Sequence, residues 1–107
     1  MAAPAEVLRF LGLMRRAGRL STGEESTGQA VRVGKARLLL LASDASPNAR
    51  KRAEAFALRG RLPLLTLTDD KGTLSDALGI PPAAMFAVCD EGFAKALQEK
   101  LRSSEGD

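Results

Sequence analysis

Apolar side chains recur at helical spacing near the start of the chain, where Val7, Leu11 and Met14 lie three or four residues apart. This spacing places the three side chains on one face of a helix over residues 6–16. Gly18 follows two residues later and is suited to end that helix, because glycine readily adopts a left-handed conformation.

Longer apolar runs predict the strands of a sheet. The stretch 37–42 is an apolar run bounded by polar residues, which is typical of a strand buried on both faces. The stretches 62–68 and 84–89 predict two further strands, with Pro63 confined to the beginning of the first. Residues 20–22 are long enough only for a very short strand or an extended link.

Further helices are predicted where a capping side chain precedes a helical pattern. They cover residues 23 to about 33, 47 to about 59, 70–78 and 91–101. Their expected caps are Thr22 (in a T-x-x-E capping box with Glu25), Ser46 (followed by Pro47), Asp69 or Asp70, and Asp90. Gly34, Gly60 and Gly79 are the expected stops of the first three.

Helices and strands alternate throughout, so the predicted fold class is α/β, a three-layer α/β/α sandwich with a small mixed sheet. One domain is expected over residues 1–102. The last five residues, 103–107, contain no apolar side chain and predict a frayed C-terminal tail.

Charge is unevenly distributed along the chain. Residues 9–61 carry twelve Lys or Arg and four Asp or Glu, a net charge of +8, whereas residues 62–107 carry four and eight, a net charge of −4. A basic half of this kind indicates a polyanionic partner, with nucleic acid the first candidate. A solvated, arginine-rich surface would have the same composition.

The composition argues against an enzyme. The chain has no His, which removes the usual general base near neutral pH and the commonest metal ligand. The single cysteine, Cys89, ends an apolar strand and is interpreted as a buried packing residue. Asp69, Asp70 and Asp76 are interpreted as capping and helix-dipole residues rather than a metal cluster. The prediction is a protein without catalytic activity, metal or other cofactor.

One cysteine also excludes an internal disulfide, which fits a reducing, cytoplasmic location. The first residues lack the pattern of a signal peptide, and no apolar run approaches the roughly 20 residues that cross a bilayer. A cytoplasmic protein without membrane contact is therefore expected.

An ordered series of short motifs extends over nearly the whole chain. In order they are Leu11-Gly12-Leu13, Arg16-Ala17-Gly18-Arg19-Leu20, Gly23, Ala30, Gly34, Ala36-Arg37-Leu38, Ala42-Ser43-Asp44-Ala45, Leu74, Ala77 and Gly79, and Phe86-Ala87-Val88. At these spacings the series resembles the kink-turn RNA-binding ribosomal protein family, that of the archaeal and eukaryotic large-subunit proteins L-seven-Ae and L-thirty-e. The closest resemblance is to its small bacterial, ribosomal-protein-like RNA-binding members.

The resemblance implies an RNA site made of two elements. In this family the first turn of the second helix reads the paired purines of a sharply bent internal loop, which here implies Gly23, Glu25, Ser26 and Gln29. Family members usually have Asn or Lys, then Glu or Gln, and finally Lys where Glu25, Ser26 and Gln29 stand, so this chain departs from the pattern. The loop before the last strand covers a flipped-out base.

That loop corresponds here to Ile80, Pro81, Pro82 and Ala83. An ordinary loop at a strand entry would have the same sequence. Phosphate contacts are expected from Lys35, Arg37 and Arg50.

The predicted function is non-enzymatic binding of structured RNA, kink-turn-like and with ribosomal RNA as one candidate, through one basic edge of a monomeric domain. The alternative is a protein-interaction module that keeps the fold and has lost kink-turn specificity. The departures at positions 25, 26 and 29 motivate this alternative.

Overall fold

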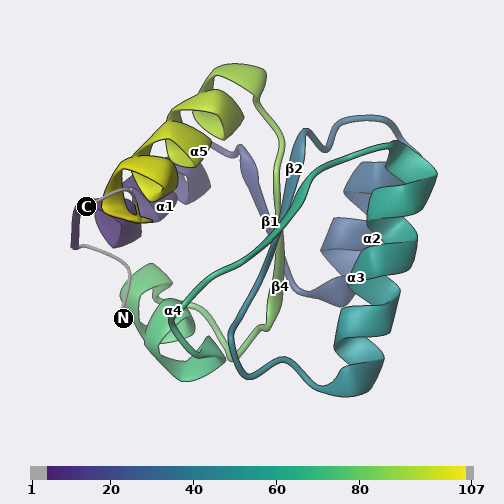
Figure 1. Ribbon diagram of the computed structural model, residues 1–107, viewed down its shortest axis with the longest axis horizontal. Coiled ribbons are helices and arrows are strands. Elements are labelled where there is room, and N and C mark those ends of the chain that lie inside the picture. The colour runs from purple at the N-terminus through teal and green to yellow at the C-terminus, as the bar shows by residue number, and fades with distance from the viewer. Residues whose placement is uncertain (1–4, 106–107) are drawn as a thin grey trace.

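A four-stranded mixed sheet lies between two layers of helices, as Figure 1 shows for the computed structural model, which describes residues 5–105. In chain order the elements are α1 (Ala5–Arg16), β1 (Leu20–Thr22), α2 (Glu24–Arg32), β2 (Leu38–Leu41), α3 (Pro47–Gly60), β3 (Leu64–Thr66), α4 (Lys71–Leu78), β4 (Met85–Val88) and α5 (Glu91–Glu105). The predicted three-layer sandwich is confirmed.

The strand order across the sheet is β1-β4-β2-β3. The last strand in the chain, β4, is antiparallel to both of its neighbours, whereas β2 and β3 are parallel. This order makes β1 and β3 the two edges of the sheet. It also places β1 beside β4, although the two strands are far apart in the sequence.

The apolar run of β2 is explained by burial on both faces. Leu38 and Leu40 pack on the side of α1, α4 and α5, whereas Leu39 and Leu41 pack on the side of α2 and α3. All four side chains are fully buried. A strand covered by helices on both sides has no solvated face, so its sequence does not alternate.

Three predicted caps are present. Ser46 Oγ accepts a hydrogen bond from the backbone N–H of Ala49 at 3.1 Å, at the start of α3. Asp70 Oδ1 accepts from the N–H of Thr73 at 2.7 Å, at the start of α4. At the start of α5, an oxygen of the Asp90 carboxylate accepts from the N–H of Phe93 at 2.8 Å.

The predicted capping box at the start of α2 is wrong. Thr22 belongs to β1, where it pairs with Phe86. The N–H of Gly23 still donates to the carbonyl of Met85 at 2.8 Å, so extended pairing continues past Thr22. The N-cap is therefore Gly23, and the helix begins one residue later than a Thr22 cap requires.

Two helix ends also differ from the prediction. Gly60 lies inside α3, and Arg61 takes the left-handed conformation with φ of 55°. A Cβ at Gly60 would lie 2.9 Å from Leu62, so glycine here permits a close approach rather than ending the helix. The helix α5 continues to Glu105, where a frayed tail was predicted from residue 103. The last two positions of that tail, 106–107, lie outside the described residues.

Candidate nucleic-acid interface

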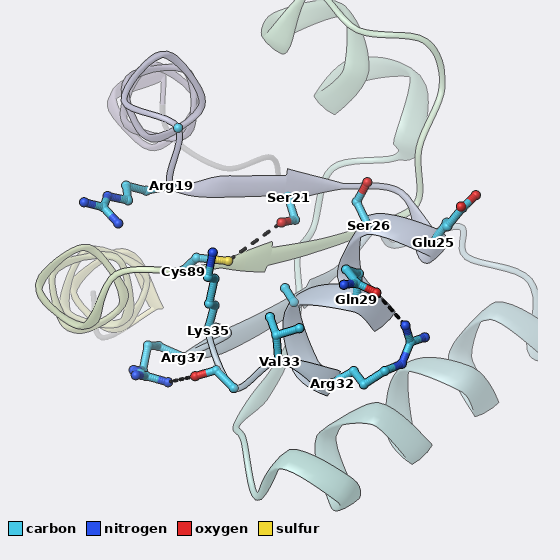
Figure 2. A pocket seen from close by; sticks show the side chains of 13 residues that line it. Arg19, Ser21, Glu25, Ser26, Gln29, Arg32, Val33, Lys35, Arg37 and Cys89 are labelled. Atoms are coloured by element: carbon cyan, nitrogen blue, oxygen red, sulfur yellow. Dashed lines mark hydrogen bonds between the residues drawn. The ribbon is translucent and has the colours of Figure 1, made fainter.

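An open groove of about 1120 Å³ runs along one side of α2, between that helix and the β1 edge of the sheet. Figure 2 shows the side chains that line it. They are Gly18, Arg19, Ser21, Glu25, Ser26, Gln29, Ala30, Arg32, Val33, Gly34, Lys35, Arg37 and Cys89.

One wall of the groove is formed by α2. Glu25 and the adjacent Ser26 lie on the first turn of α2 and Gln29 lies on the next, and all three line the groove, as does Val33 one turn after Gln29. The side chain of Gln29 accepts a hydrogen bond from the guanidinium of Arg32, which holds its amide in place. The structure thus brings together three of the residues that the family resemblance implied.

Cationic side chains gather at the far end of α2. Lys35 and Arg37 lie between α2 and β2, and Arg19 reaches the same end from the turn before β1 (Figure 2). The guanidinium of Arg37 donates to the backbone carbonyls of Gly34 at 2.9 Å and Ala36 at 3.1 Å.

The end of β4 holds both cationic segments by their backbones. The N–H of Cys89 donates to the carbonyl of Arg19 at 2.8 Å, and the N–H of Arg37 donates to the carbonyl of Val88 at 2.8 Å. Two segments from different parts of the chain are therefore fixed on either side of one strand. This arrangement places their positive charges around the same groove.

The floor of the groove is formed by Ser21 and Cys89. The Ser21 Oγ and Cys89 Sγ atoms lie 3.7 Å apart in a weak hydrogen bond. Cys89 was interpreted as buried, but it is half-buried and lines the groove. The reason is that β1 has only three residues and forms the edge of the sheet, so little covers the end of β4 on that side.

No side chain caps the start of α2. Its N-cap residue, Gly23, has φ of 93° and ψ of 162° and lacks a side chain that could accept a hydrogen bond from the first N–H groups of the helix. The Glu24 carboxylate forms an ion pair with Arg52 of α3, whereas Glu25 is exposed at the groove. Of the two carboxylates at this helix start, one is thus already paired with a cation.

The predicted base-covering loop, residues 80–83, lies on the same side as the start of α2, since Gly23 bonds to the first residue of the strand that follows the loop. Its Ile80 and Ala83 are partly buried against the core, and the Ala83 N–H donates to Ser75 Oγ at 2.9 Å. Pro81 and Pro82 are exposed. The part of the loop that can meet a ligand is therefore the proline pair, and the groove itself does not include it.

Arg50 does not belong to this site. Its guanidinium donates to Thr66 Oγ1 of β3 at 3.3 Å, at the edge of the sheet opposite β1. Sequence reasoning could not orient one turn of α3, so it grouped Arg50 with residues that lie at the opposite edge of the sheet.

Sequence reasoning missed several groove residues: Arg19, Ser21, Arg32, Val33 and Cys89. The usable signal was the pair of glycines Gly18 and Gly34, each with a positive φ and each directly before a cation of the groove. Such glycines mark sharp turns that direct the next residue toward a site.

Two of the acidic residues, Asp70 and Asp90, cap helices. The backbone N–H of Thr73, and after it the Thr73 side chain, donate hydrogen bonds to the Asp70 carboxylate and hold its pKa below its usual value, which is expected for a carboxylate at a helix start. Within the described part of the chain, no group of three or more Asp, Glu, Cys or His residues is arranged to hold a metal ion. Likewise, no helix among the described residues has the length and apolar character needed to cross a membrane.

Comparisons with known proteins agree with this fold. The profile of the ribosomal protein L7Ae/L30e/S12e/Gadd45 family matches residues 5–98. The RNA-binding protein YlxQ of Enterococcus faecium is 33% identical over 90% of this chain and 91% of its own length. The RNA-binding protein YlxQ of Bacillus subtilis (strain 168) is 31% identical over 82% and 87%.

Solved structures show the same architecture. A protein of unknown function from Bacillus halodurans superposes with a TM-score of 0.82 at 31% identity, covering 92% of this chain and 98% of that one. The Giardia lamblia 15.5kD RNA binding protein superposes with a TM-score of 0.73 at 18% identity, covering 98% and 92%. At that identity the second match speaks for the fold alone.

Proposed function

Because the chain belongs to the ribosomal protein L7Ae/L30e/S12e/Gadd45 family, we propose that it is a non-enzymatic RNA-binding protein. Its target is a structured, kink-turn-like RNA, held along the groove edge from the Pro81–Pro82 loop to Lys35 and Arg37. Two relatives that share its length are named RNA-binding proteins, which supports RNA as the ligand.

The observation that carries the proposal is the convergence at the end of β4. Arg19 and Arg37 are fixed there by backbone hydrogen bonds of 2.8 Å, at one end of the groove, and the start of α2, where Gly23 has no side chain to cap the helix, lies at the other end. Guanidinium and ammonium groups bind phosphate oxygens, and the N–H groups of a helix start bind anions or acceptors. The edge therefore offers both kinds of contact that RNA requires.

Glu25 and Gln29 supply the base contacts in this proposal. A carboxylate only accepts hydrogen bonds, so Glu25 suits base amino groups, and the Gln29 amide can donate as well as accept. Purines of a bent internal loop expose such edges, whereas a regular A-form helix hides them in a deep, narrow groove. The exposed Pro81 and Pro82 would cover an extruded base with little loss of loop entropy.

The remaining parts of the proposal follow from the ligand. The protein acts as a monomer in the cytoplasm, and ribosomal RNA is one candidate source of its target. Catalysis is not part of the proposed role, since the chain has no His and the acids at helix starts serve as caps.

Fluorescence anisotropy of a labelled kink-turn RNA across a salt series tests the proposal. The comparison RNA has its sheared G·A pairs replaced by Watson–Crick pairs. We expect tighter binding of the kinked RNA and, if about five phosphates are neutralised, a slope of log affinity against log salt of about −3.5 to −4.5. No binding of either RNA at moderate salt would contradict it.

A protein-interaction module is the second candidate, because Glu25, Ser26 and Gln29 place a carboxylate and no cation on the first turns of α2. Reversing the charges of Lys35 and Arg37 separates the two candidates. The change should abolish RNA binding, whereas a protein contact made elsewhere would survive it.

A further inference from the structure

The far end of the groove, beyond the start of α2, has a chemistry of its own. From Glu25 to Val33 the groove follows α2 for about 12 Å, given a rise of 1.5 Å per residue. The kink-reading contacts lie at the beginning of this path. Val33, Lys35 and Cys89 lie at its other end, where a regular helical stem would have no bases to offer.

This end of the groove combines an apolar wall with a polar floor. Val33 is 51% exposed, which is unusual for so large an apolar side chain in this molecule, and it lines the groove together with Ala30. Cys89 and Ser21 form the floor opposite them. An apolar wall beside hydrogen-bonding groups suits a flat heterocycle, whose faces are apolar and whose edges are polar.

The rim of the groove is strongly positive. Four cationic side chains and one carboxylate line the whole groove, and three of the cations, Arg19, Lys35 and Arg37, stand at this end. Because β4 fixes the backbones of Arg19 and Arg37, binding costs little reordering of the protein main chain. The charge complements a phosphodiester backbone.

The concave shape favours an unpaired strand over a duplex. A duplex would lay its phosphates on the rim and leave the groove floor empty, because its bases are stacked and paired inside. An unpaired strand can place its phosphates on the rim and turn a base inward. The groove volume of about 1120 Å³ also exceeds the ~300–1,000 Å³ of pockets for single small molecules, so a strand segment suits it better.

We propose that the far end of this groove binds an unpaired RNA segment that continues from the kinked element. One base lies against Val33 and Cys89, and the adjoining phosphates share the rim cations Arg19, Lys35 and Arg37 with the phosphates of the kinked element. This inference rests on the proposed function and adds the class of RNA that must flank the kink.

The single cysteine of the chain gives a direct readout, since any thiol reaction reports on Cys89 alone. The rate of its alkylation by iodoacetamide is measured with saturating hexauridylate, with a blunt RNA duplex of six base pairs, and with hexaglutamate. We expect the single strand to slow the reaction at least fivefold and the other two to leave it unchanged. Equal rates in all samples, or protection by duplex or acidic peptide as strong as that by hexauridylate, would overturn the inference.

A second measurement links the groove to the kinked RNA. Binding of the kink-turn RNA is compared with binding of the same RNA carrying an unpaired extension of four nucleotides on either strand. One of the two extensions should tighten binding about tenfold, the size expected for one covered base. The variant Val33→Asn should abolish that gain and leave binding of the unextended RNA within about twofold. Leu58→Asn, which alters an 82% exposed leucine on α3, is the matched control and should keep the gain.

The two proposals fail in different ways. If none of the three kinked RNAs binds, the proposed function is wrong. If all three bind equally and Cys89 stays reactive in the complexes, the proposed function stands and the groove inference alone is wrong.

Discussion

The start of α2 differs from the starts of α3, α4 and α5. Each of the latter three has a side-chain oxygen, from Ser46, Asp70 or Asp90, that accepts a hydrogen bond from the backbone N–H three residues later. The residue at the start of α2 is Gly23, which has no side chain to accept such a bond and whose backbone conformation is one that only glycine adopts readily.

A side-chain cap satisfies one of the N–H groups at a helix start and stabilises the fold, whereas a helix start without such a cap has N–H groups that a ligand can bind. The charged residues around α2 differ in the same way. The Glu24 carboxylate forms an ion pair with Arg52, whereas the Glu25 carboxylate lines the groove. The other end of the helix is followed by Lys35 and Arg37 of the groove rim. The difference supports the proposal that the edge containing α2 meets the partner, because the other three helix starts use their first N–H groups within the fold.

The largest expected effect is on RNA affinity, from reversing two groove cations. Lys35→Glu with Arg37→Glu should weaken binding of kink-turn RNA on the order of 100-fold and make the salt slope shallower by about two. Fluorescence anisotropy at several salt concentrations measures both. Lys51→Glu with Arg59→Glu changes the net charge equally on the exposed surface of α3. An equal loss in this control pair would show that only overall charge matters.

The second largest expected effect is on the free energy of unfolding, from a substitution at the start of α2. Gly23→Ala places a Cβ on a residue with φ of 93°, and such strained positions cost about 1–3 kcal/mol in the free energy of unfolding. Urea denaturation measures the change. Gly12→Ala is the matched control, because Gly12 lies inside α1 near only the end of an arginine side chain and should gain about 0.5–1 kcal/mol. If Gly23→Ala were as stable as the parent protein, the backbone at the start of α2 would not require glycine at this position.

Helix starts closed by a side chain can be predicted from local sequence, whereas the start of α2 cannot. Caps such as Ser46 and Asp70 act within three residues, so local sequence is enough to find them. The capping box of Thr22 and Glu25 satisfied the same local rule, yet the pairing of β1 with β4 overrode it.

In the candidate site, too, local sequence predicts the contacts within one helix and not those made through strand pairing. Glu25, Ser26 and Gln29 share one short helix, and their placement together follows from helical spacing. Ser21 and Cys89 are 68 residues apart and meet only because β4 pairs with β1. Sequence spacing carries no information about such a contact unless the strand order is known.

A smaller effect is expected on discrimination between RNAs. Glu25→Gln should reduce the preference for kinked over straight RNA by about tenfold, since a base-edge contact is worth roughly 1–3 kcal/mol. Glu24→Gln should leave the preference unchanged, because the Glu24 carboxylate faces Arg52. Parallel titrations of the two RNAs measure the ratio. If Glu25→Gln tightens binding of both RNAs equally, Glu25 only repels phosphate and reads no base.

The smallest expected effect is on the pH dependence of stability, from removing the charge of Asp70 at the start of α4. The bond from Thr73 lowers the pKa of Asp70 in the folded protein. A carboxylate with a depressed folded pKa contributes stability above its unfolded pKa of about 3.9, and this contribution is lost as the pH falls through the lower folded value. Asp70→Asn keeps a cap oxygen without the charge. Its urea midpoint should lie slightly below that of the parent protein at pH 7, and the two should converge toward pH 2.

The same pH series sharpens the contrast with α2. The strain expected in Gly23→Ala lies in the backbone and involves no titrating group, so its stability penalty should be equal at pH 7 and pH 2.5. The Asp70→Asn penalty, by contrast, should shrink across that interval, since it depends on an ionised carboxylate. Urea midpoints of the two variants and the parent at both pH values test this. A Gly23→Ala penalty that also shrinks at low pH would indicate that the start of α2 depends on a charge and is not the uncapped, backbone-determined end described above.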